Sequence, residues 1–192
     1  MKVIRAVLSA FLTMSLVGNV CFAKNVDNQE QYIMDSIWGS MTEEQRFNSD
    51  LKYKANAVRL SEEEFIFFAR VIEAESDGKG WEGYTNKGRI AIAACIWDRV
   101  YSGDFPNTVT GVLTQSGQFT TVSNGWCSKN STSASEWAII KGREAVINGD
   151  LPNNLNWFNC INFCHTPYDV IGDNYFSTTG QATYFEEGEF YG

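Results

Sequence analysis

The sequence predicts a mainly α (α+β) protein: a small helical domain followed by a shorter region of loops and short strands. Helix-start signals precede apolar runs with three-and-four spacing, which is typical of amphipathic helices. The run IAIAACIWDRVYSG is rich in small apolar residues and suits a fully buried helix. The chain has only 3 prolines, the residue that most strongly breaks helices. From Leu151 onward the sequence is rich in aromatic residues, Asn and Gly, as in loops and short strands.

The N-terminal segment, residues 1–23, has the pattern of a secretory signal peptide. It carries two positive charges, an apolar run from about Ala6 to Val17, and small residues before a cleavage site after Ala23. The apolar run is too short for a good membrane span. We therefore expect an exported protein of the cell envelope or the medium, with no stable membrane span in its mature form.

Two further units are expected after the signal peptide. Residues 24–60 are polar and mixed, which predicts an N-terminal extension or linker with helical pieces. The remaining residues, 61–192, suit a single domain.

The segment from Ser61 to Gly83 is the one around which this domain is organised. Ser61 and Glu64 have capping-box spacing, and acidic residues fill the first turn, so a helix is predicted from residue 62 to about residue 76. Gly78 and Gly80 then end it.

Glu75 stands out at the last turn of this helix. It shares a helix face with Phe68, Val71 and Ile72. A carboxyl group against hydrocarbon has a raised pKa, which a general acid working near neutral pH requires. The alternative is a solvated glutamate, or one paired with a nearby basic residue. Glu73 lies on a different face, and we expect it to be structural.

Three more helices are predicted downstream: Lys87–Tyr101, Val109–Thr114 and Ser133–Asn148. A turn at Gln115–Gly117 introduces Gln118. For the last helix, Ser133 and Glu136 have capping-box spacing and Gly149 follows the final residue. The residues expected on its buried side are Ala134, Trp137, Ala138, Ile140, Ala145 and Ile147.

Four cysteines remain after the signal peptide, and three pairings are possible. Cys95 lies in the apolar helical run and is expected to be a buried thiol. The preferred disulfide joins Cys127 to Cys160 or Cys164. A zinc site at Cys160, Cys164 and His165 is disfavoured, because His165 is the only histidine in the chain. A cysteine-protease pair that uses His165 is equally disfavoured.

The charge of the chain excludes several kinds of partner. The net charge is −8, and removing the two basic residues of the signal peptide leaves 13 basic against 23 acidic residues, a mature charge near −10. Nucleic acids and anionic membranes both bind basic protein surfaces. The negative charge therefore argues against a nucleic-acid partner and against electrostatic binding to a membrane. The chain also has 13 Phe, 8 Tyr and 6 Trp, more aromatic surface than a core needs, which suits stacking against sugar rings.

Several sequence segments together carry a family resemblance. They are FARVIEAESDGKGWEG, GRIAIAACIWDRV, DFPNTVTGVLTQSGQFTTV, ASEWAIIKGREAVINGDLP, LNWFNC and IGDNYF. In this order they resemble the SleB-type spore-cortex-lytic and cell wall hydrolase family over residues 62–178. The most specific parts are Ala74-Glu75-Ser76 followed by Glu82-Gly83, and the run at 105–119 that ends in Gln118 and Phe119.

The resemblance implies a lysozyme-like, mostly helical catalytic domain whose short β- and loop-rich region lines a glycan cleft. The implied activity is that of a lytic transglycosylase acting on peptidoglycan glycan strands, with Glu75 as catalytic acid and base. No metal or organic cofactor is implied, and we expect a monomer.

The resemblance also implies substrate contacts. Gln118 is the best candidate for a polar contact and Glu82 for a second carboxylate in the cleft. The alternative for Gln118 is a buried amide that holds a turn. The alternative for Glu82 is a surface or structural charge. The other residues expected at the substrate are Ser76, Phe119, Trp157, Asn159 and Tyr175.

Departures from the family pattern affect the expected substrate. Lys79 stands where the family usually has an acid, Asn174 replaces a common histidine, and Tyr84 to Lys87 are additional. Spore cortex and ordinary wall therefore both remain possible substrates. Two other functions also stay open: a muramidase-type hydrolase with Glu82 or Glu73 as helper, and an inactive glycan-binding module.

Overall fold

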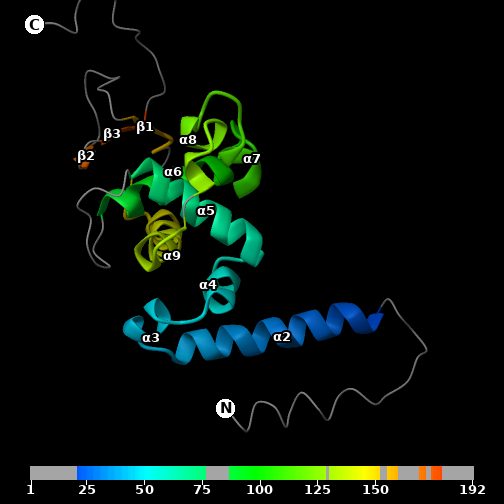
Figure 1. The fold of residues 1–192 in the computed structure, drawn as a ribbon. Coiled ribbons are helices and arrows are strands. Elements are labelled where there is room, and N and C mark those ends of the chain that lie inside the picture. Colours follow the sequence, from blue (N-terminus) through cyan, green and yellow to red (C-terminus); the bar gives the residue numbers. More distant parts are fainter. Residues whose placement is uncertain are drawn as a thin grey trace, which may run out of the picture.

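The computed structural model describes residues 21–76, 87–128, 130–151, 155–159, 169–171 and 174–178. Helices make up most of this part of the chain, and the strands follow them near the C-terminal end (Figure 1). This arrangement confirms the predicted mainly α class with a short β region. In chain order the elements are α2 (Cys21–Ser40), α3 (Glu43–Phe47), α4 (Leu51–Ala57), α5 (Glu62–Glu75), α6 (Lys87–Tyr101), α7 (Val109–Leu113), α8 (Thr120–Ser123), η1 (Trp126–Ser128), α9 (Ser133–Asn148), β1 (Trp157–Asn159), β2 (Asp169–Ile171) and β3 (Asn174–Ser177).

Helix α5 starts where the sequence predicts. The Ser61 hydroxyl accepts the Glu64 amide at 3.2 Å, and the Glu64 carboxylate accepts the Ser61 amide at 3.4 Å, which completes the capping box. The apolar face of α5 is fully buried and includes Phe68, Val71 and Ile72. Because α5 contacts α4, α6, α7, α8, α9 and η1, it lies at the centre of the helical domain.

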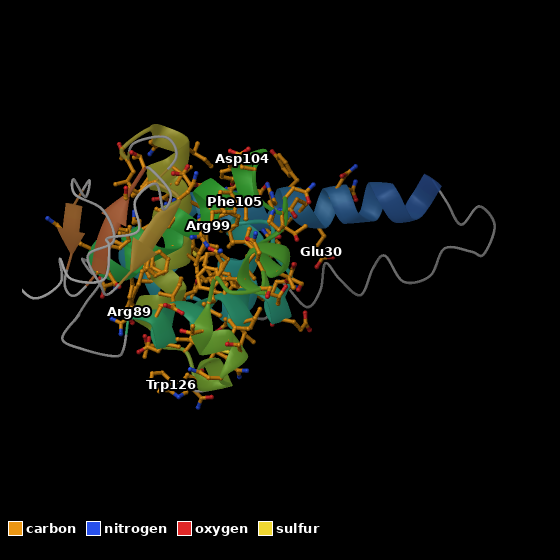
Figure 2. The ribbon with its side chains drawn as sticks, turned by 90° about the horizontal axis from the view of Figure 1, so that it is seen from above. Glu30, Arg89, Arg99, Asp104, Phe105 and Trp126 are labelled. Atoms are coloured by element: carbon orange, nitrogen blue, oxygen red, sulfur yellow. The ribbon has the colours of Figure 1, made fainter. Side chains whose placement is uncertain are left out.

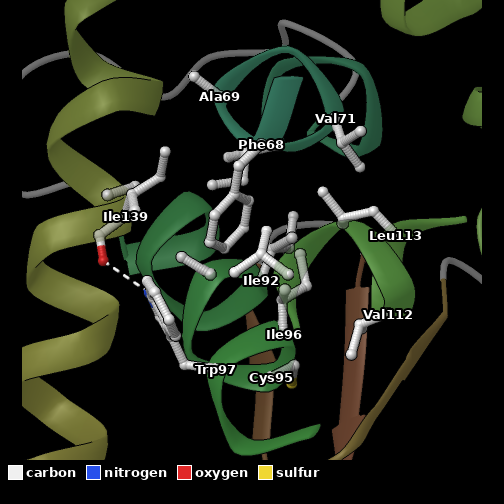
Figure 3. Packing of buried hydrophobic residues seen from close by; sticks show 14 of the residues in the cluster. Phe68, Ala69, Val71, Ile92, Cys95, Ile96, Trp97, Val112, Leu113 and Ile139 are labelled. Carbon is white, nitrogen blue, oxygen red and sulfur yellow. Dashed lines mark hydrogen bonds between the residues drawn. The ribbon is translucent and has the colours of Figure 1, made fainter. Parts of the chain in front are cut away.

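Helices α6 and α9 form the largest helix pair of the domain. The Trp97 indole of α6 donates a hydrogen bond to the Ile139 carbonyl of α9 at 2.9 Å, and Phe68 of α5 packs edge-on against Trp97 (Figure 3). Gly142 allows the close approach of the two helices. A Cβ atom there would lie 2.7 Å from the Cβ of Ala93. The small residues of α6 thus serve the close helix packing for which the sequence predicts a buried helix.

The start of α9 differs in detail from the prediction. Its N-cap is Thr132, whose hydroxyl accepts the Ser135 amide at 3.3 Å, so the predicted Ser133–Glu136 capping box is wrong. Glu136 instead pairs at 2.8 Å with the buried ammonium of Lys54, which the local spacing does not reveal. At the other end Gly149 closes the helix in the left-handed conformation, with φ +72°, as expected. The prediction that Ile147 is buried is also wrong, since it is 59% exposed.

The predicted extension, 24–60, contains α3, α4 and most of α2, which starts at Cys21, before the expected cleavage site after Ala23. Its last helix joins the core of the domain, because Ala55 is 1% and Val58 3% exposed. Helix α2 packs on α4 and lies at the opposite end of the molecule from the strands (Figure 1). Among the residues that the structure describes, no helix combines the length and the apolar character needed to cross a membrane.

The three strands form an antiparallel sheet in the order β1–β3–β2. The register pairs Phe158 with Phe176, whose rings stack at 5.8 Å between centroids. Phe158 also contacts the Phe119 ring at 6.2 Å. The sheet is therefore attached to the helical domain beside the start of α8.

Cys95 is fully buried as a free thiol, as the sequence predicts. Cys127 is also a free thiol, so the preferred disulfide from Cys127 is not formed in the structure. Cys160, Cys164 and His165 lie outside the described residues.

We expect Gly142→Ala to lower the free energy of unfolding by about 1–3 kcal/mol, because the added methyl group overpacks the contact between α9 and α6. Urea denaturation measures this change. Gly39→Ala is the control, since a Cβ atom at Gly39 meets nothing within 4 Å. Equal stability of the two variants would contradict the close approach of α6 and α9.

Candidate active site

Glu75 is the last residue of α5, and its side chain is half-buried. It follows Phe68, Val71 and Ile72 on the buried face of the helix, each 0% exposed. Helix α5 thus carries a carboxylate at the edge of the hydrophobic core. This position agrees with the apolar environment that the sequence predicts for Glu75.

Thr121, on α8, holds the Glu75 carboxylate. Its hydroxyl donates a hydrogen bond to Oε1 of Glu75 at 2.5 Å, and its backbone amide also donates to this carboxylate. The N-cap residue of α8 is Phe119, which has no side-chain oxygen to accept the first amides of the helix. The Glu75 carboxylate accepts one of these amides, that of Thr121, so the start of α8 and the orientation of Glu75 depend on each other.

The pKa of Glu75 is raised above its ordinary value. Burial is the largest cause, because it disfavours the charged carboxylate. The hydrogen bonds from Thr121 and the positive charge of Arg99 oppose this rise without cancelling it. Glu75 therefore retains its proton to a higher pH than an ordinary glutamate, while the two neighbours keep its charged form accessible.

Arg99 is a buried cation of α6 near this carboxylate, 3% exposed. Its Nε donates to the Asn156 carbonyl at 2.7 Å, directly before β1. Its guanidinium lies over the rings of Phe105 and Phe119, 5.2 and 5.4 Å from their centroids; Figure 2 labels Arg99 and Phe105. Arg99 thereby connects α6 to the segment before α7, to the start of α8 and to the sheet.

Glu73, two residues before Glu75, has the opposite environment. Its carboxylate accepts hydrogen bonds from Thr132 at 2.7 Å and from Ser135, and pairs with Arg89 at 3.0 Å. Burial alone would raise the pKa of Glu73, but these hydrogen bonds and the charge of Arg89 together hold it below the ordinary value. Glu73 therefore anchors the end of α5 to α6 and α9 as a carboxylate, in agreement with the structural role predicted for it.

The two glutamates are thus separated chemically by their surroundings. Glu73 is saturated with donors, whereas Glu75 lies against the core with Thr121 as its hydrogen-bond donor. Divergent pKa values of neighbouring carboxyl groups are a common mark of an acid–base site. This contrast identifies Glu75, and not Glu73, as the candidate acid.

Three other predicted site residues lie next to Glu75 in the chain or just before α8. Ser76 is 6% exposed, and its hydroxyl donates to the Glu73 carbonyl at 3.0 Å, which favours a structural role. Phe119 is 4% exposed and packs against Arg99 and Phe158, so it supports the site from within. Gln118 is half-buried in the turn before α8 and remains a candidate for a polar substrate contact.

The predicted groove residues belong to the sheet. Trp157 and Asn159 are the first and last residues of β1, and the register places Asn159 opposite Tyr175 of β3. Since β1 begins next to Asn156, these strand positions adjoin the Arg99 anchor. Glu82 lies outside the described residues.

Thr121 and Arg99 were not predicted from the sequence. Thr121 belongs to the run FTTV. A hydroxyl residue near the start of a helix is the one sequence signal that could have indicated its role. Arg99 is, like Arg89, a charged residue in a helix with a long run of small apolar residues, a pattern that indicates a buried ionic contact. Within the described ranges no group of three or more His, Cys, Asp or Glu residues is arranged to hold a metal ion.

Comparison with known proteins defines the class. A model of the cell wall hydrolase family matches residues 83–184, more than half of the chain. The chain belongs to the cell wall hydrolase family. Glu75 lies just before the matched range.

The particular relatives are spore cortex-lytic enzymes. The chain is 33% identical to that of Bacillus cereus over 101 residues, 52% of this chain and 36% of the relative. It is 35% identical to that of Oceanobacillus iheyensis over 106 residues, 52% of this chain and 33% of the relative. The chain thus spans about a third of the length of these curated relatives.

Two solved structures are also similar to this chain. Each is 26% identical to it, and each match covers 61% of this chain. One is the catalytic domain of the germination-specific lytic transglycosylase SleB from Bacillus anthracis, with a TM-score of 0.48 and 95% of that chain covered. The other is the catalytic domain of the Bacillus cereus SleB protein, with a TM-score of 0.49 and 91% covered. The lysozyme-like part of the fold prediction stays a prediction.

We expect Glu73→Gln to lower the free energy of unfolding at pH 7 by about 2 kcal/mol or more, because it removes the charged partner of buried Arg89. The depressed pKa of Glu73 means that its contribution is present above the ordinary glutamate value of 4.5 and is lost as the pH falls through the lower folded value. Urea denaturation of wild type and variant between pH 3 and 7 measures it.

The control is Glu63→Gln, at an exposed position in the first turn of α5. An unfolding free energy of Glu73→Gln equal to that of this control at every pH would show that the buried ion pair does not hold the end of α5.

Proposed function

We propose that this protein is an exported peptidoglycan lytic transglycosylase that uses Glu75 as both general acid and general base. The observation that carries the proposal is the half-buried Glu75 carboxyl, held by Thr121 and with a raised pKa, in a chain of the cell wall hydrolase family. The family and the names of the relatives support peptidoglycan as the substrate. The bond cleaved is the MurNAc–GlcNAc glycosidic bond.

The proposed reaction needs a single carboxyl group. Glu75 donates its proton to the glycosidic oxygen as the bond from that oxygen to the anomeric carbon breaks. The C6 hydroxyl of the same muramoyl residue attacks the anomeric carbon and forms the new C–O bond. Glu75, now a carboxylate, accepts the proton of that hydroxyl. No water is consumed, and the product ends in a 1,6-anhydromuramoyl group.

The environment of Glu73 supports this single-carboxyl route. Hydrolysis by inversion or retention normally uses a second carboxylate as base or nucleophile. Among the carboxylates of the described residues, Glu73 is the nearest to Glu75 in the chain, but Arg89, Thr132 and Ser135 already engage it. In the transglycosylase the substrate supplies the nucleophile, which is held within the same sugar.

The cellular role is proposed on the same basis. Residues 1–23 would act as a signal peptide, which would place the enzyme at the cell wall, spore cortex or periplasm, or in the medium. Residues 61–192 would form the catalytic domain, and the burial of Ala55 and Val58 supports including α4 in it. The spore cortex-lytic relatives make a role in germination one candidate, with the vegetative wall as the other.

Glu75→Gln should lower the rate of release of soluble fragments from purified sacculi by about 10²–10⁴-fold, the usual contribution of a general acid. The amide cannot supply the proton. Glu63→Gln, at an exposed position at the other end of α5, serves as the matched control and should keep wild-type activity. Full activity of Glu75→Gln would refute the proposed role of Glu75.

Mass spectrometry of the wild-type digest then identifies the reaction. Anhydromuramoyl ends are expected. Reducing muramoyl ends would assign the protein to muramidase-type hydrolases instead, and binding of sacculi without fragments would make it a glycan-binding module.

The rate should fall as the pH rises through the pKa of Glu75, because the first step needs the protonated acid. Since the hydrogen bond from the Thr121 hydroxyl lowers this pKa, its removal in Thr121→Val should raise the pKa and move the falling limb of the kcat/KM profile to higher pH. Thr120→Val, at the exposed neighbouring position, should leave the limb in place. A limb that stays or moves to lower pH in Thr121→Val would contradict the assignment of the limb to Glu75.

A further inference from the structure

The segment from Thr121 to Thr132 is attached at both ends to the last turn of α5. Thr121 donates to Glu75 at 2.5 Å, and Thr132 donates to Glu73 at 2.7 Å. Between these anchors, η1 packs against both α5 and α8. The segment is therefore a wall beside the end of α5 that carries the candidate acid.

Trp126 projects from this wall and is 58% exposed. Its backbone position is well defined, because its amide donates to Oδ1 of Asn124 at 3.0 Å and Gly125 makes the turn at φ +78°. The next residue, Cys127, is half-buried and packs on the core. The backbone at Trp126 is thus fixed while its side chain faces solvent, at the edge of the molecule in Figure 2.

The other large exposed aromatic side chains differ from Trp126 in their surroundings. The Tyr101 ring stacks on Trp97 at 5.8 Å, and its hydroxyl accepts a hydrogen bond from Arg143 at 3.0 Å. Tyr32, 76% exposed, lies on α2 rather than on the wall of the site. Within the described part of the chain, no aromatic ring or cation contacts the Trp126 indole, so its face is open to a ligand.

We propose that Trp126 is a stacking platform for a pyranose ring of the glycan strand, in a binding subsite next to Glu75. This inference rests on the proposed function and names a residue that recognises its substrate. A pyranose presents a face of C–H groups that matches a large flat indole, and the indole N–H remains available to a sugar hydroxyl.

The charge of the protein favours this kind of contact. The chain has a net charge of −8, and the stem peptides of peptidoglycan carry carboxylates. Long-range attraction between opposite charges is therefore not expected to hold the substrate, and apolar contact with the sugar faces is a source of affinity that does not depend on it. An exposed aromatic ring on a fixed backbone loses little freedom on binding, which suits it to this task.

The test measures binding separately from cleavage. In the Glu75→Gln background, Trp126→Ala should weaken co-sedimentation with purified sacculi about tenfold, whereas Trp126→Phe should retain part of the affinity. The parent protein should also show a change in tryptophan fluorescence when a GlcNAc–MurNAc tetrasaccharide is added, and Trp126→Ala should lack it. Tyr32→Ala is the matched control and should bind as the parent does.

Each outcome decides the proposal. Unchanged binding of Trp126→Ala, or a parent that binds neither sacculi nor tetrasaccharide, overturns the subsite. Because the Trp126 side chain is exposed, we expect Trp126→Ala to unfold at the same temperature as Tyr32→Ala. Equal unfolding temperatures exclude a folding defect as the cause of weaker binding. If the subsite is confirmed but wild-type protein releases no fragments, the proposed reaction fails while the glycan site stands.

Discussion

The hydrogen bonds at the last turn of α5 hold the candidate site together. Glu73 and Glu75 lie two residues apart on this turn, and each binds a different part of the chain. Glu73 joins α5 to α6 through Arg89 and to the start of α9 through Thr132 and Ser135. Glu75 accepts hydrogen bonds from the hydroxyl and the backbone amide of Thr121, at the start of α8. The position of the candidate acid is therefore fixed by contacts from three separate segments.

The same arrangement explains how one helix carries two carboxyl groups with opposite properties. The donors around Glu73 keep it charged, and a charged group is a good structural anchor. The burial of Glu75 raises its pKa, while Thr121 and the buried charge of Arg99 limit the rise. A group that must give up a proton and then take one back needs such a balance. Arg99 also links α6 to Phe119 and to the start of β1, so the electrostatics and the architecture of the site depend on one side chain.

Local signals predicted the helices well because they arise from neighbours in the chain. The Ser61–Glu64 capping box, the apolar face of α5 and the small residues of α6 all act within a few residues, and each is confirmed. Two local predictions for α9, the Ser133–Glu136 capping box and the burial of Ile147, are wrong, and the contacts that the sequence did not reveal join distant residues. Glu136 binds Lys54, which precedes it by 82 positions, and Thr121 reaches Glu75 across 46. A sequence pattern identifies Glu75 as an unusual glutamate, but only the folded chain shows which groups set its pKa.

The central claim is that the surroundings of Glu75 keep it protonated to a higher pH than an ordinary glutamate. Carboxyl ¹³C NMR titration of glutamate-labelled protein measures this directly, with Glu75→Gln and Glu73→Gln used to assign the two resonances. The structure predicts that Glu75 titrates above the ordinary value of 4.5 and Glu73 below it. A Glu75 carboxyl that titrates at or below 4.5 would contradict the account.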